Sequence, residues 1–444
     1  MSSRVLLIAY LFPPAGGVGV LRALSFAKYL PQSGHQVHVL SAWNPTAPTL
    51  DPDLLNHVPK NVKVHRAFTP ELPFHFRQKL WKFIAPAGPK KPQENSKIAA
   101  ENKAGLKSTL GGLIRRFLSP DPEVVWVPFA LRKARKIIRD HNIDTVLVTV
   151  PPFSSLLIGT ALKREFPQVN LISDFRDEWF QFHLSVFAFH NNSHTLQRAR
   201  QIEADAVQAS DSVLSVVPSI IEQMRNRHPD QPPAKFRVIS NGFDPDLTAG
   251  FQSRPHGCPK VVVTFVGTVY GPSTLQYYLN ALDGLPEEIR ARFETRLIGR
   301  IAGDEKSIVD NAKSKIEVLG FMSQAEAFRR MEETDFLLLT MTDPSCITGK
   351  FFDYIGTRKP MLALTPEGGE VQRMLAETSS GWWADYRDGG AIRNLLMRAH
   401  DAAIANTIPV TPREIADRFA RPKLTAELGD LIDRLKSDAL TPAH

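Results

Sequence analysis

Short apolar segments alternate with helical patterns along most of the chain, and this alternation constrains the fold more than any other feature. In the first half, helical patterns at 20–30 and 198–209 lie between apolar segments. Those apolar segments are 5–10, 36–40, 145–150, 169–173 and 211–217. Strands that alternate with helices form parallel sheets with right-handed crossovers. The first half is therefore predicted to be an α/β domain.

A second α/β series begins after a break that follows Ser240. Asn241-Gly242 and Asp244-Pro245 are strong turn signals, and weak periodicity follows as far as Pro259. Apolar segments then resume at 260–267, 295–298, 316–319, 335–340 and 360–364, with helical patterns at 324–333, 388–407 and 412–437. A chain of 444 residues exceeds one ordinary core. We predict one domain at 1–245, a second at 255–415, and a closing helix within 416–444.

The composition is typical of a globular protein from a reducing compartment. Hydrophobic residues make up 43% and charged residues 23% of the chain. Cys258 and Cys346 are the two cysteines, which excludes a disulfide framework. The apolar segment at 5–12 runs into Pro13-Pro14 rather than a cleavage site, so it is interpreted as a buried strand. No apolar segment reaches the length of a membrane span, and we expect a cytoplasmic protein.

The net charge of +8 has a local source in the segment 71–118. This segment holds ten Lys and Arg against three Glu, and its parts 76–84 and 106–117 have amphipathic patterns. Two interpretations stay open: helices that cover the sheet of the first domain, or a basic apolar surface at 76–118 that binds an anionic membrane. The second would place the protein peripherally on the inner face of the plasma membrane. Aromatic stacking motifs for nucleic acid are not evident, so no nucleic-acid partner is expected.

A glycine-rich loop follows the first predicted strand. It runs from Tyr10 to Arg22 and contains Gly16 and Gly17 just before a helix. Glycines let the backbone approach a ligand, and a helix start favours anions. The spacing differs from the dinucleotide fingerprint, and no acidic residue ends the second strand near Leu40. The alternative is an ordinary turn between a strand and a helix.

A charged motif stands where a later buried strand ends. It reads Ser173-Asp174-Phe175-Arg176-Asp177-Glu178-Trp179. In open α/β sheets the carboxyl ends of the strands line the ligand crevice. Asp174 and Asp177 are therefore candidates to hold sugar hydroxyls or to orient Arg176. The alternative is an Asp–Arg salt bridge that caps the next helix.

The segment from Ser345 to Glu370 carries the most specific pattern. If Thr348 starts a helix, Lys350, Asp353 and Thr357 share one face. The opposite, inward face would hold Ile347, Phe351, Tyr354 and Ile355. A polar ridge with unpaired amides at a helix start suits a charged phosphorylated ligand.

Together these three motifs resemble glycosyltransferase family 4, the retaining enzymes of GT-B type, over nearly the whole chain. The Asp-x-Arg-Asp-x-Trp motif at 174–179 resembles a subgroup that acts on cell-surface glycans. The resemblance implies two Rossmann-like domains that face each other across a cleft, with the last helix crossing back to the first domain. It places the acceptor on the first domain and the nucleotide sugar on the second.

The resemblance also implies roles for individual residues. Gly16 and Gly17 would face the cleft, and Arg22 would contact a phosphate or the acceptor. Gly267 and Thr268 would line the donor site, and Gly320-Phe321 matches the stretch whose backbone contacts the base. The amides of Ile347, Thr348, Gly349 and Lys350 would meet the diphosphate, and Asp353 would bind the ribose. Glu367, Gly368 and Gly369 would reach the donor sugar, or form only a capped turn.

The chain departs from the family pattern at three places. The family places an arginine and a lysine after Gly267-Thr268, whereas residues 269–274 contain no basic side chain. Arg300 or Lys350 would then supply the charge, although Arg300 is also interpretable as a solvated loop residue. Of two family glutamates eight positions apart, only the second is matched by a carboxylate, Asp353. Ser345 occupies the position of the first glutamate, so the role of that glutamate is unfilled unless Asp343 takes it. A histidine found near 174–179 in many members is absent here.

The resulting hypothesis is retaining transfer of a sugar from a nucleotide-diphosphate sugar to a glycan or lipid-linked acceptor. Arg176, Asp174, Asp177, Lys350 and Arg300 are the catalytic candidates. Neither a metal nor a further cofactor is expected, because basic side chains and helix amides would stabilise the leaving diphosphate. Two alternatives stay open: a nucleotide-sugar 2-epimerase of the same fold, and a non-catalytic nucleotide-sugar or glycan-binding protein.

Overall fold

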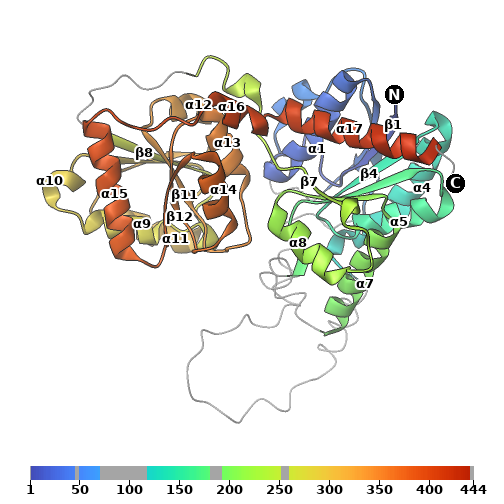
Figure 1. The fold of residues 1–444 in the computed structure, drawn as a ribbon, viewed down its shortest axis with the longest axis horizontal. Helices are drawn as coiled ribbons and strands as arrows, with labels where there is room; N and C mark the ends of the chain where they lie inside the picture. The colour runs from blue at the N-terminus through green and yellow to red at the C-terminus, as the bar shows by residue number, and fades with distance from the viewer. Residues whose placement is uncertain (1, 46–49, 71–117, 181–192, 252–259, 441–444) are drawn as a thin grey trace, which may run out of the picture. The chain divides into compact units, whose positions relative to one another are not determined.

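The computed structural model describes residues 2–45, 50–70, 118–180, 193–251 and 260–440. The chain divides into two compact units (Figure 1). The first consists of Met1–Ile239 with Thr425–His444, and the second of Ser240–Leu424. The two predicted amphipathic parts of the basic segment, at 76–84 and 106–117, lie outside the described residues. No helix in the described part of the chain has the length and apolarity needed to cross a membrane.

The first unit contains a parallel sheet whose described strands are ordered β3-β2-β1-β4-β5-β6-β7. The strands are β1 Arg4–Ile8, β2 Gln36–Ala42, β3 Lys63–Ala67, β4 Thr145–Val150, β5 Asn170–Phe175, β6 Ser212–Ser215 and β7 Phe236–Val238. The helices are α1 Val18–Tyr29, α4 Val127–His141, α5 Ser155–Glu165, α7 Ser193–Ala209 and α8 Pro218–Arg227. Every residue of β4 and β5 is buried, which explains why these strands are uninterrupted apolar segments in the sequence.

The last helix, α17 (Arg421–Leu440), returns to the first unit from Thr425 onward. Leu428, Leu431 and Ile432 are buried along it. Lys436 Nζ donates to Asp144 Oδ2 at 2.9 Å and to the carbonyl of Ser2 at 2.7 Å. The predicted return of the closing helix to the first domain is therefore confirmed.

The continuous helix predicted at 412–437 is wrong in one respect. It is divided into α16 (Arg413–Ala416), a 3-10 turn at Asp417–Phe419, and α17. Ala420 is extended, with φ −69° and ψ 128°. Pro422 follows and has no N–H to donate to an earlier turn, so it fits the first turn of a new helix rather than a helix interior.

The second unit contains a parallel sheet ordered β10-β9-β8-β11-β12-β13 in its described part. The strands are β8 Val261–Val266, β9 Phe293–Ile298, β10 Ile316–Gly320, β11 Phe336–Thr340, β12 Met361–Leu364 and β13 Gly381–Ala384. The helices are α9 Gln276–Asp283, α10 Glu287–Arg290, α11 Gly303–Asp310, α12 Gln324–Glu332, α13 Gly349–Thr357, α14 Glu370–Thr378 and α15 Gly389–Ile404. Figure 1 shows α9 and α15 on one face of this sheet and α13 and α14 on the other. Each unit is thus Rossmann-like, as predicted.

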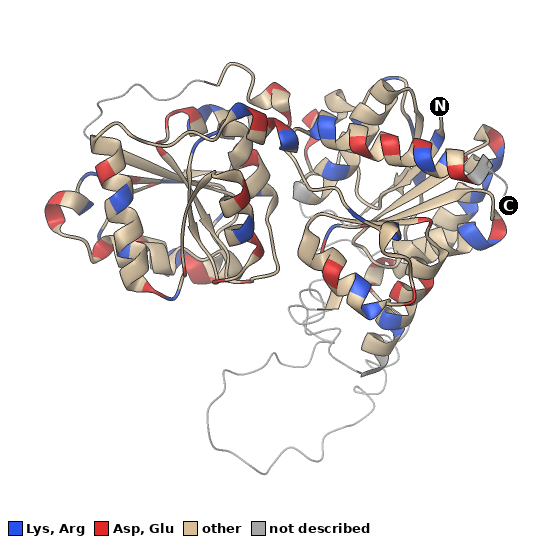
Figure 2. Cartoon of the chain, in the orientation of Figure 1, with Lys and Arg blue, Asp and Glu red and all other residues tan. Residues whose placement is uncertain are grey.

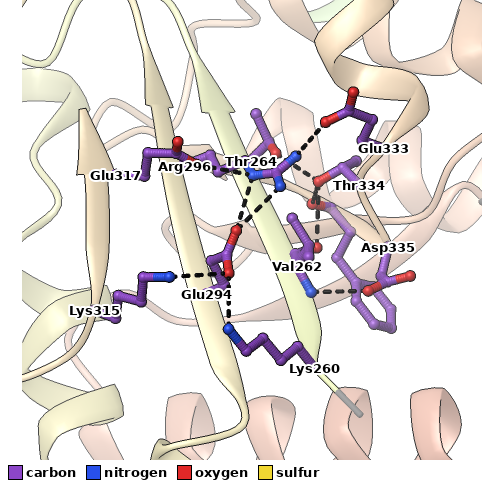
Figure 3. Close-up of polar contacts among 11 residues, drawn as sticks. Lys260, Val262, Thr264, Glu294, Arg296, Lys315, Glu317, Glu333, Thr334 and Asp335 are labelled. Atoms are coloured by element: carbon purple, nitrogen blue, oxygen red, sulfur yellow. Dashed lines mark hydrogen bonds and ion pairs between the residues drawn. The ribbon is translucent and has the colours of Figure 1, made fainter. Parts of the chain in front are cut away.

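A network of ion pairs crosses one edge of the second sheet (Figure 3). Arg296 on β9 contacts Glu294, Glu317 and Glu333 at 2.9–3.2 Å. Glu294 also lies 3.4 Å from Lys315 and 3.5 Å from Lys260. The charged groups of this network neutralise one another across three strands, so we assign it to sheet stability.

Figure 2 shows Lys and Arg interspersed with Asp and Glu along the helices of both units. Most of the net charge of +8 comes from the segment 71–118, almost all of which lies outside the described residues.

Candidate functional site

The loops after β8 and β9 approach each other through two glycines. Gly267 has φ 124° and Gly299 has φ 132°, a region that side-chain-bearing residues rarely adopt. A Cβ built on Gly299 would overlap the carbonyl oxygen of Gly267. The amides of Gly267 and Val269 donate to the carbonyls of Ile298 and Arg300, each at 2.8 Å. These contacts fix the carboxyl end of β8, and the loops after β8 and β9 meet through their backbones at the two glycines.

Lys350 extends from the first turn of α13 to this glycine loop. Its Nζ lies 3.3 Å from Ser273 Oγ and 3.9 Å from the ring centroid of Phe265. A Cβ on Gly267 would be 3.4 Å from the same nitrogen. Burial lowers the pKa of Lys350 to about 7, and Cys346 opposes that shift. Lys350 thus brings a positive charge to the loop after Gly267, where residues 269–274 contain no basic side chain.

The start of α13 presents backbone donors next to Lys350. Thr348 is the N-cap, its side chain does not cap the helix, and its buried Oγ1 has no hydrogen-bond partner. The first amides of an α-helix have no partner within the helix and carry partial positive charge. Lys350 and this helix start together form a cationic corner beside Gly267.

Asp353 follows Lys350 by one helical turn. Its Oδ1 is buried without a hydrogen-bond partner, and Arg421 Nη2 lies 3.9 Å from it. Burial raises the pKa of Asp353 to about 6; Arg421 opposes this shift and Asp244 adds to it. A buried carboxylate oxygen without a donor is costly, and a ligand hydroxyl would satisfy it.

The predicted inward face of α13 is confirmed, because Ile347, Phe351, Tyr354 and Ile355 are all buried. Tyr354 fixes the helix to the sheet: its hydroxyl accepts from the amide of Val266 at 2.9 Å and donates to the carbonyl of Leu338 at 3.3 Å. Thr357 does not extend the polar ridge as predicted. It is buried, and its hydroxyl donates to the carbonyl of Tyr354 at 2.7 Å.

Arg300 also lies at the carboxyl ends of the strands, in the loop that follows β9. It is exposed, and its guanidinium carbon is 4.9 Å from the ring centroid of Phe321. Phe321 follows Gly320 (φ 73°) at the end of β10 and is 70% exposed. Of the two basic candidates, Lys350 contacts the glycine loop, and Arg300 stacks on the aromatic ring that follows β10.

Two further loops lie at the carboxyl ends of the strands of this sheet, one after β11 and one after β12. Asp343 Oδ1 accepts from the amide and the hydroxyl of Ser345, at 2.9 and 2.7 Å. The amide of Glu367 donates to Asp385 Oδ2 at 3.1 Å, and the amide of Gly368 donates to Gln372 Oε1 at 2.6 Å. Glu367, Gly368 and Thr268 are exposed, whereas Gly369 packs against the carbonyl of Pro344. All of these loops follow the carboxyl ends of parallel strands, where ligands bind in open α/β sheets.

In the first unit, Arg22 and Asp174 form a buried ion pair. Arg22 Nη2 lies 2.8 Å from Asp174 Oδ1, and Arg22 Nε lies 2.9 Å from Oδ2. Thr149 Oγ1 also donates to Oδ2, at 2.8 Å. Asp174 therefore pairs with Arg22 of the glycine-loop helix, not with its neighbour Arg176.

Arg176 binds backbone carbonyls instead. Its Nε donates to Val150 at 3.0 Å, its Nη2 to Pro151 at 2.6 Å, and its Nη1 to Gly19. Burial lowers the pKa of Arg176, while Asp177 and Asp174 oppose that shift. The side chain connects the loop after β4 to the first turn of α1, next to Gly17 (φ 94°) and the buried Gly16.

Two features of the first unit were missed by the sequence reasoning. Asp121 precedes a 3-10 turn at Pro122–Trp126; its Oδ2 accepts from the amide of Ser154 at 2.9 Å, and its Oδ1 is buried without a partner. Burial raises the pKa of Asp121 to about 7, and Glu123 adds to the shift. The second is a group of three histidines far apart in sequence, described below. Neither has a local motif that would have revealed it.

Comparison with known proteins supports the resemblance. Residues 82–247 match the model of Glycosyltransferase Family 4. No curated protein matches the chain. Among solved structures, a sucrose-phosphate synthase from Thermosynechococcus elongatus has 13% identity and a TM-score of 0.62, with 98% of this chain and 100% of that chain covered. Anabaena HepE in complex with UDP-glucose has 14% identity and a TM-score of 0.58, with coverages of 97% and 99%.

A third structure, WaaG, is a glycosyltransferase involved in lipopolysaccharide biosynthesis. It has 14% identity and a TM-score of 0.58, with 96% of this chain and 99% of that chain covered. At such identities these structures establish the fold alone, which is GT-B. Residues 82–247 therefore carry a Glycosyltransferase Family 4 domain, and the chain is a glycosyltransferase with the GT-B fold.

Proposed function

We propose that this enzyme transfers a sugar, with retention, from a nucleotide-diphosphate sugar to a glycan or lipid-linked acceptor of a cell-surface polysaccharide. The observation that carries the proposal is the position of Lys350, whose Nζ lies beside Gly267 at the start of α13. Anabaena HepE binds UDP-glucose, which makes a nucleotide sugar the natural donor class to test. The Asp174–Asp177 motif supports membership of the subgroup that acts on surface glycans.

The leaving diphosphate would bind at the cationic corner. The transition state develops negative charge on the leaving group, and preorganised donors stabilise it more than they stabilise the ground state. Lys350 and the amides from Ile347 to Gly349 are such donors. Because its pKa is about 7, Lys350 would take up a proton when the anionic donor arrives at neutral pH. These groups would neutralise the charge of the diphosphate, so we assign no metal ion to this role.

The remainder of the donor would extend from this corner. The unpartnered Oδ1 of Asp353 is placed to accept from a ribose hydroxyl. Phe321, with its neighbour Gly320 and the stacked Arg300, presents an exposed aromatic face for the base. Glu367, Gly368, Gly369 and Thr268 would contact the sugar or the phosphates.

The acceptor would bind to the first unit, at the carboxyl ends of β1, β4 and β5. Here the structure modifies the roles that we proposed from sequence. Arg22 and Asp174 satisfy each other, so they position the glycine loop for the acceptor. Arg176 holds the carbonyls of Val150 and Pro151. We assign Asp177 to acceptor hydroxyls because it follows the carboxyl end of β5.

We also propose that the enzyme acts in the cytoplasm, because its two cysteines suit a reducing compartment. Attachment to an anionic membrane through 76–118 is also proposed, from the charge and amphipathic pattern of that segment. Vesicles of anionic and of neutral phospholipid would test this attachment. Equal sedimentation of the protein with both kinds would remove it.

A two-step experiment tests the function. UDP-, GDP- and ADP-sugars are first screened by thermal shift, and NMR then follows the products of the stabilising donor with a lipid-linked glycan acceptor. Retained configuration in a new glycosidic bond supports the proposal. A free 2-epimer would establish epimerisation instead, and binding with neither product would favour a binding protein or an acceptor other than the one supplied.

A further inference from the structure

Three histidines from three separate elements meet at one edge of the first sheet. His38 lies on β2, His65 on β3, and His141 is the last residue of α4. Leu40 pairs with His65 across the two strands, and His38 and Leu40 are two residues apart on β2. Side chains alternate along a strand, so His38 and His65 extend from the same face of the sheet.

The ring nitrogens of these histidines converge. One nitrogen from each ring lies within 4.8 Å of one nitrogen from each of the others. His38 Nδ1 and His65 Nε2 are 3.1 Å apart. The ring centroid of His141 is 4.2 Å from that of His38 and 5.7 Å from that of His65.

We propose that His38, His65 and His141 bind a transition-metal ion of the Zn²⁺ type, with a water molecule as the fourth ligand. Zn–N bonds of about 2.0–2.1 Å place tetrahedral ligand nitrogens about 3.4 Å apart. The nitrogens of His38 and His65, 3.1 Å apart, are near that separation, but they face each other across nearly parallel rings, so both rings must turn to share one ion. The three ligand nitrogens lie within 4.8 Å of one another, so His141 closes the set by a movement of up to about 1.4 Å. Without a metal, one of the first two rings donates a hydrogen bond to the other.

The surroundings of the three rings favour nitrogen coordination over simple electrostatic binding. His38 is buried and His65 and His141 are half-buried, so the three rings are largely withdrawn from water. The group consists of imidazole nitrogens and offers none of the carboxylate oxygens by which proteins bind Mg²⁺ or Ca²⁺. Imidazole ligands instead suit Zn²⁺, Cu²⁺, Ni²⁺ and Co²⁺.

The position of the site indicates a structural role. His141 ends α4, and the C-terminal end of a helix favours a cation. The bound ion would connect that helix end to β2 and β3, at the edge of the sheet. The candidate acceptor residues belong instead to the carboxyl ends of β1, β4 and β5, so the metal is not expected to take part in transfer.

The test uses full-length protein without an affinity tag, stripped with a chelator and titrated with Zn²⁺ by calorimetry. One equivalent should bind. His65→Ala and His141→Ala should each weaken the affinity by more than the roughly 10- to 100-fold that loss of an outer-shell partner costs. His57→Ala, at an exposed histidine of the same unit, is the matched control and should bind like the unaltered protein. Mg²⁺ should give no heat.

Two further measurements keep the proposal falsifiable if a variant folds poorly. Zn²⁺ should raise the melting temperature of the unaltered protein and of His57→Ala, but not that of His65→Ala. X-ray absorption of the Zn²⁺-loaded unaltered protein should show three imidazole ligands. Absence of Zn²⁺ binding, or a spectrum without three imidazoles, would mean that the rings merely pack together as neutral neighbours.

Discussion

The ammonium of Lys350 lies against Gly267, so that a Cβ on the glycine would be 3.4 Å from Nζ. The two residues are far apart in sequence, yet the start of α13 returns the lysine to the loop after β8. Its contact with Ser273 Oγ and its place over the Phe265 ring hold it there. A buried amine without a carboxylate at hydrogen-bonding distance among its described contacts is costly to keep, which favours a functional reason for its presence.

Lys350→Ala should lower the turnover of the donor by about 100-fold, the lower end of what loss of one transition-state donor costs. Lys306→Ala, at an exposed lysine of α11 paired with Asp310, is the control and should leave turnover unchanged. Steady-state kinetics with the donor identified by thermal shift give the comparison. Equal rates for Lys350→Ala and the control would remove Lys350 from the site.

The same lysine should impose a pH dependence. With a pKa of about 7 in the free enzyme, Lys350 loses its charge as pH rises, so kcat/KM should fall above about pH 7. Lys350→Arg keeps its charge, so any activity it retains should lack this decrease. A decrease that persists unchanged in Lys350→Arg would assign the titration to another group.

Lys350→Met should stabilise the fold while it impairs turnover. The folded pKa of Lys350 lies below the ordinary value of 10.5, so the unfolded chain binds more protons near neutral pH. The buried amine therefore lowers the free energy of unfolding at neutral pH, and this lowering is the penalty. Removing the amine should raise the free energy of unfolding by about 1 kcal/mol or more at pH 7. Since the penalty of the unaltered protein fades between about pH 7 and 10.5, the gain should shrink over that window. Urea unfolding at pH 7 and pH 10 measures both.

Asp353→Asn should weaken nucleotide binding by about 10-fold, the cost of a hydrogen bond to a charged group. Asp310→Asn, at an exposed residue of α11, is the control. In the unaltered protein, nucleotide affinity should fall as pH decreases through about 6, because Asp353 then gains a proton. Titration calorimetry at pH 5 and pH 8, on the unaltered protein and on Asp353→Asn, checks both expectations: the titration of Lys350 is common to the two proteins, so the Asp353 effect is the difference between their pH dependences. Equal affinities for Asp353→Asn and the unaltered protein would exclude the ribose contact.

Much of the fold was predictable because the central strands of both sheets are buried on both faces. β4, β5 and β8 are continuous apolar segments, and the helices between them have apolar stripes. The short strands β3, β7 and β13 were missed, since each carries exposed or half-buried residues and no clear alternation. The start of α13 at Thr348 was predictable from local spacing alone.

The connections between distant residues were not predictable in the same way. Arg22 and Asp174 are 152 positions apart, and the motif around Asp174 offered the nearer Arg176 as a partner. The sheet order brings β1 and β5 to either side of β4, which only tertiary structure supplies. His38, His65 and His141 were likewise invisible, because none belongs to a short metal-ligand motif.

The buried ion pair between Arg22 and Asp174 gives a prediction about the stability of the first unit. Arg22→Met alone should destabilise the protein by about 3–5 kcal/mol, because it leaves Asp174 buried without its partner. The double variant Arg22→Met, Asp174→Leu should recover most of that loss, since both charges are gone. Urea unfolding measures the recovery. If the double variant is as unstable as the single one, the pair does not account for the cost.

Gly299→Ala should be the most damaging of the conservative substitutions in the second unit. The new methyl group would overlap the Gly267 carbonyl, and the backbone has φ 132°, so we expect a loss of at least about 2 kcal/mol in the free energy of unfolding. Gly303→Ala is the matched control, because its Cβ meets nothing within 4 Å and it begins α11. That variant should be neutral or gain up to about 1 kcal/mol in the free energy of unfolding.

Since the displaced Gly267 loop also holds Lys350, Gly299→Ala should weaken donor binding even at temperatures where it stays folded. Thermal unfolding and donor titration, done on both variants, measure these effects. Donor affinity equal to that of Gly303→Ala would show that the loop tolerates displacement and that its close approach to the β9 loop serves stability alone.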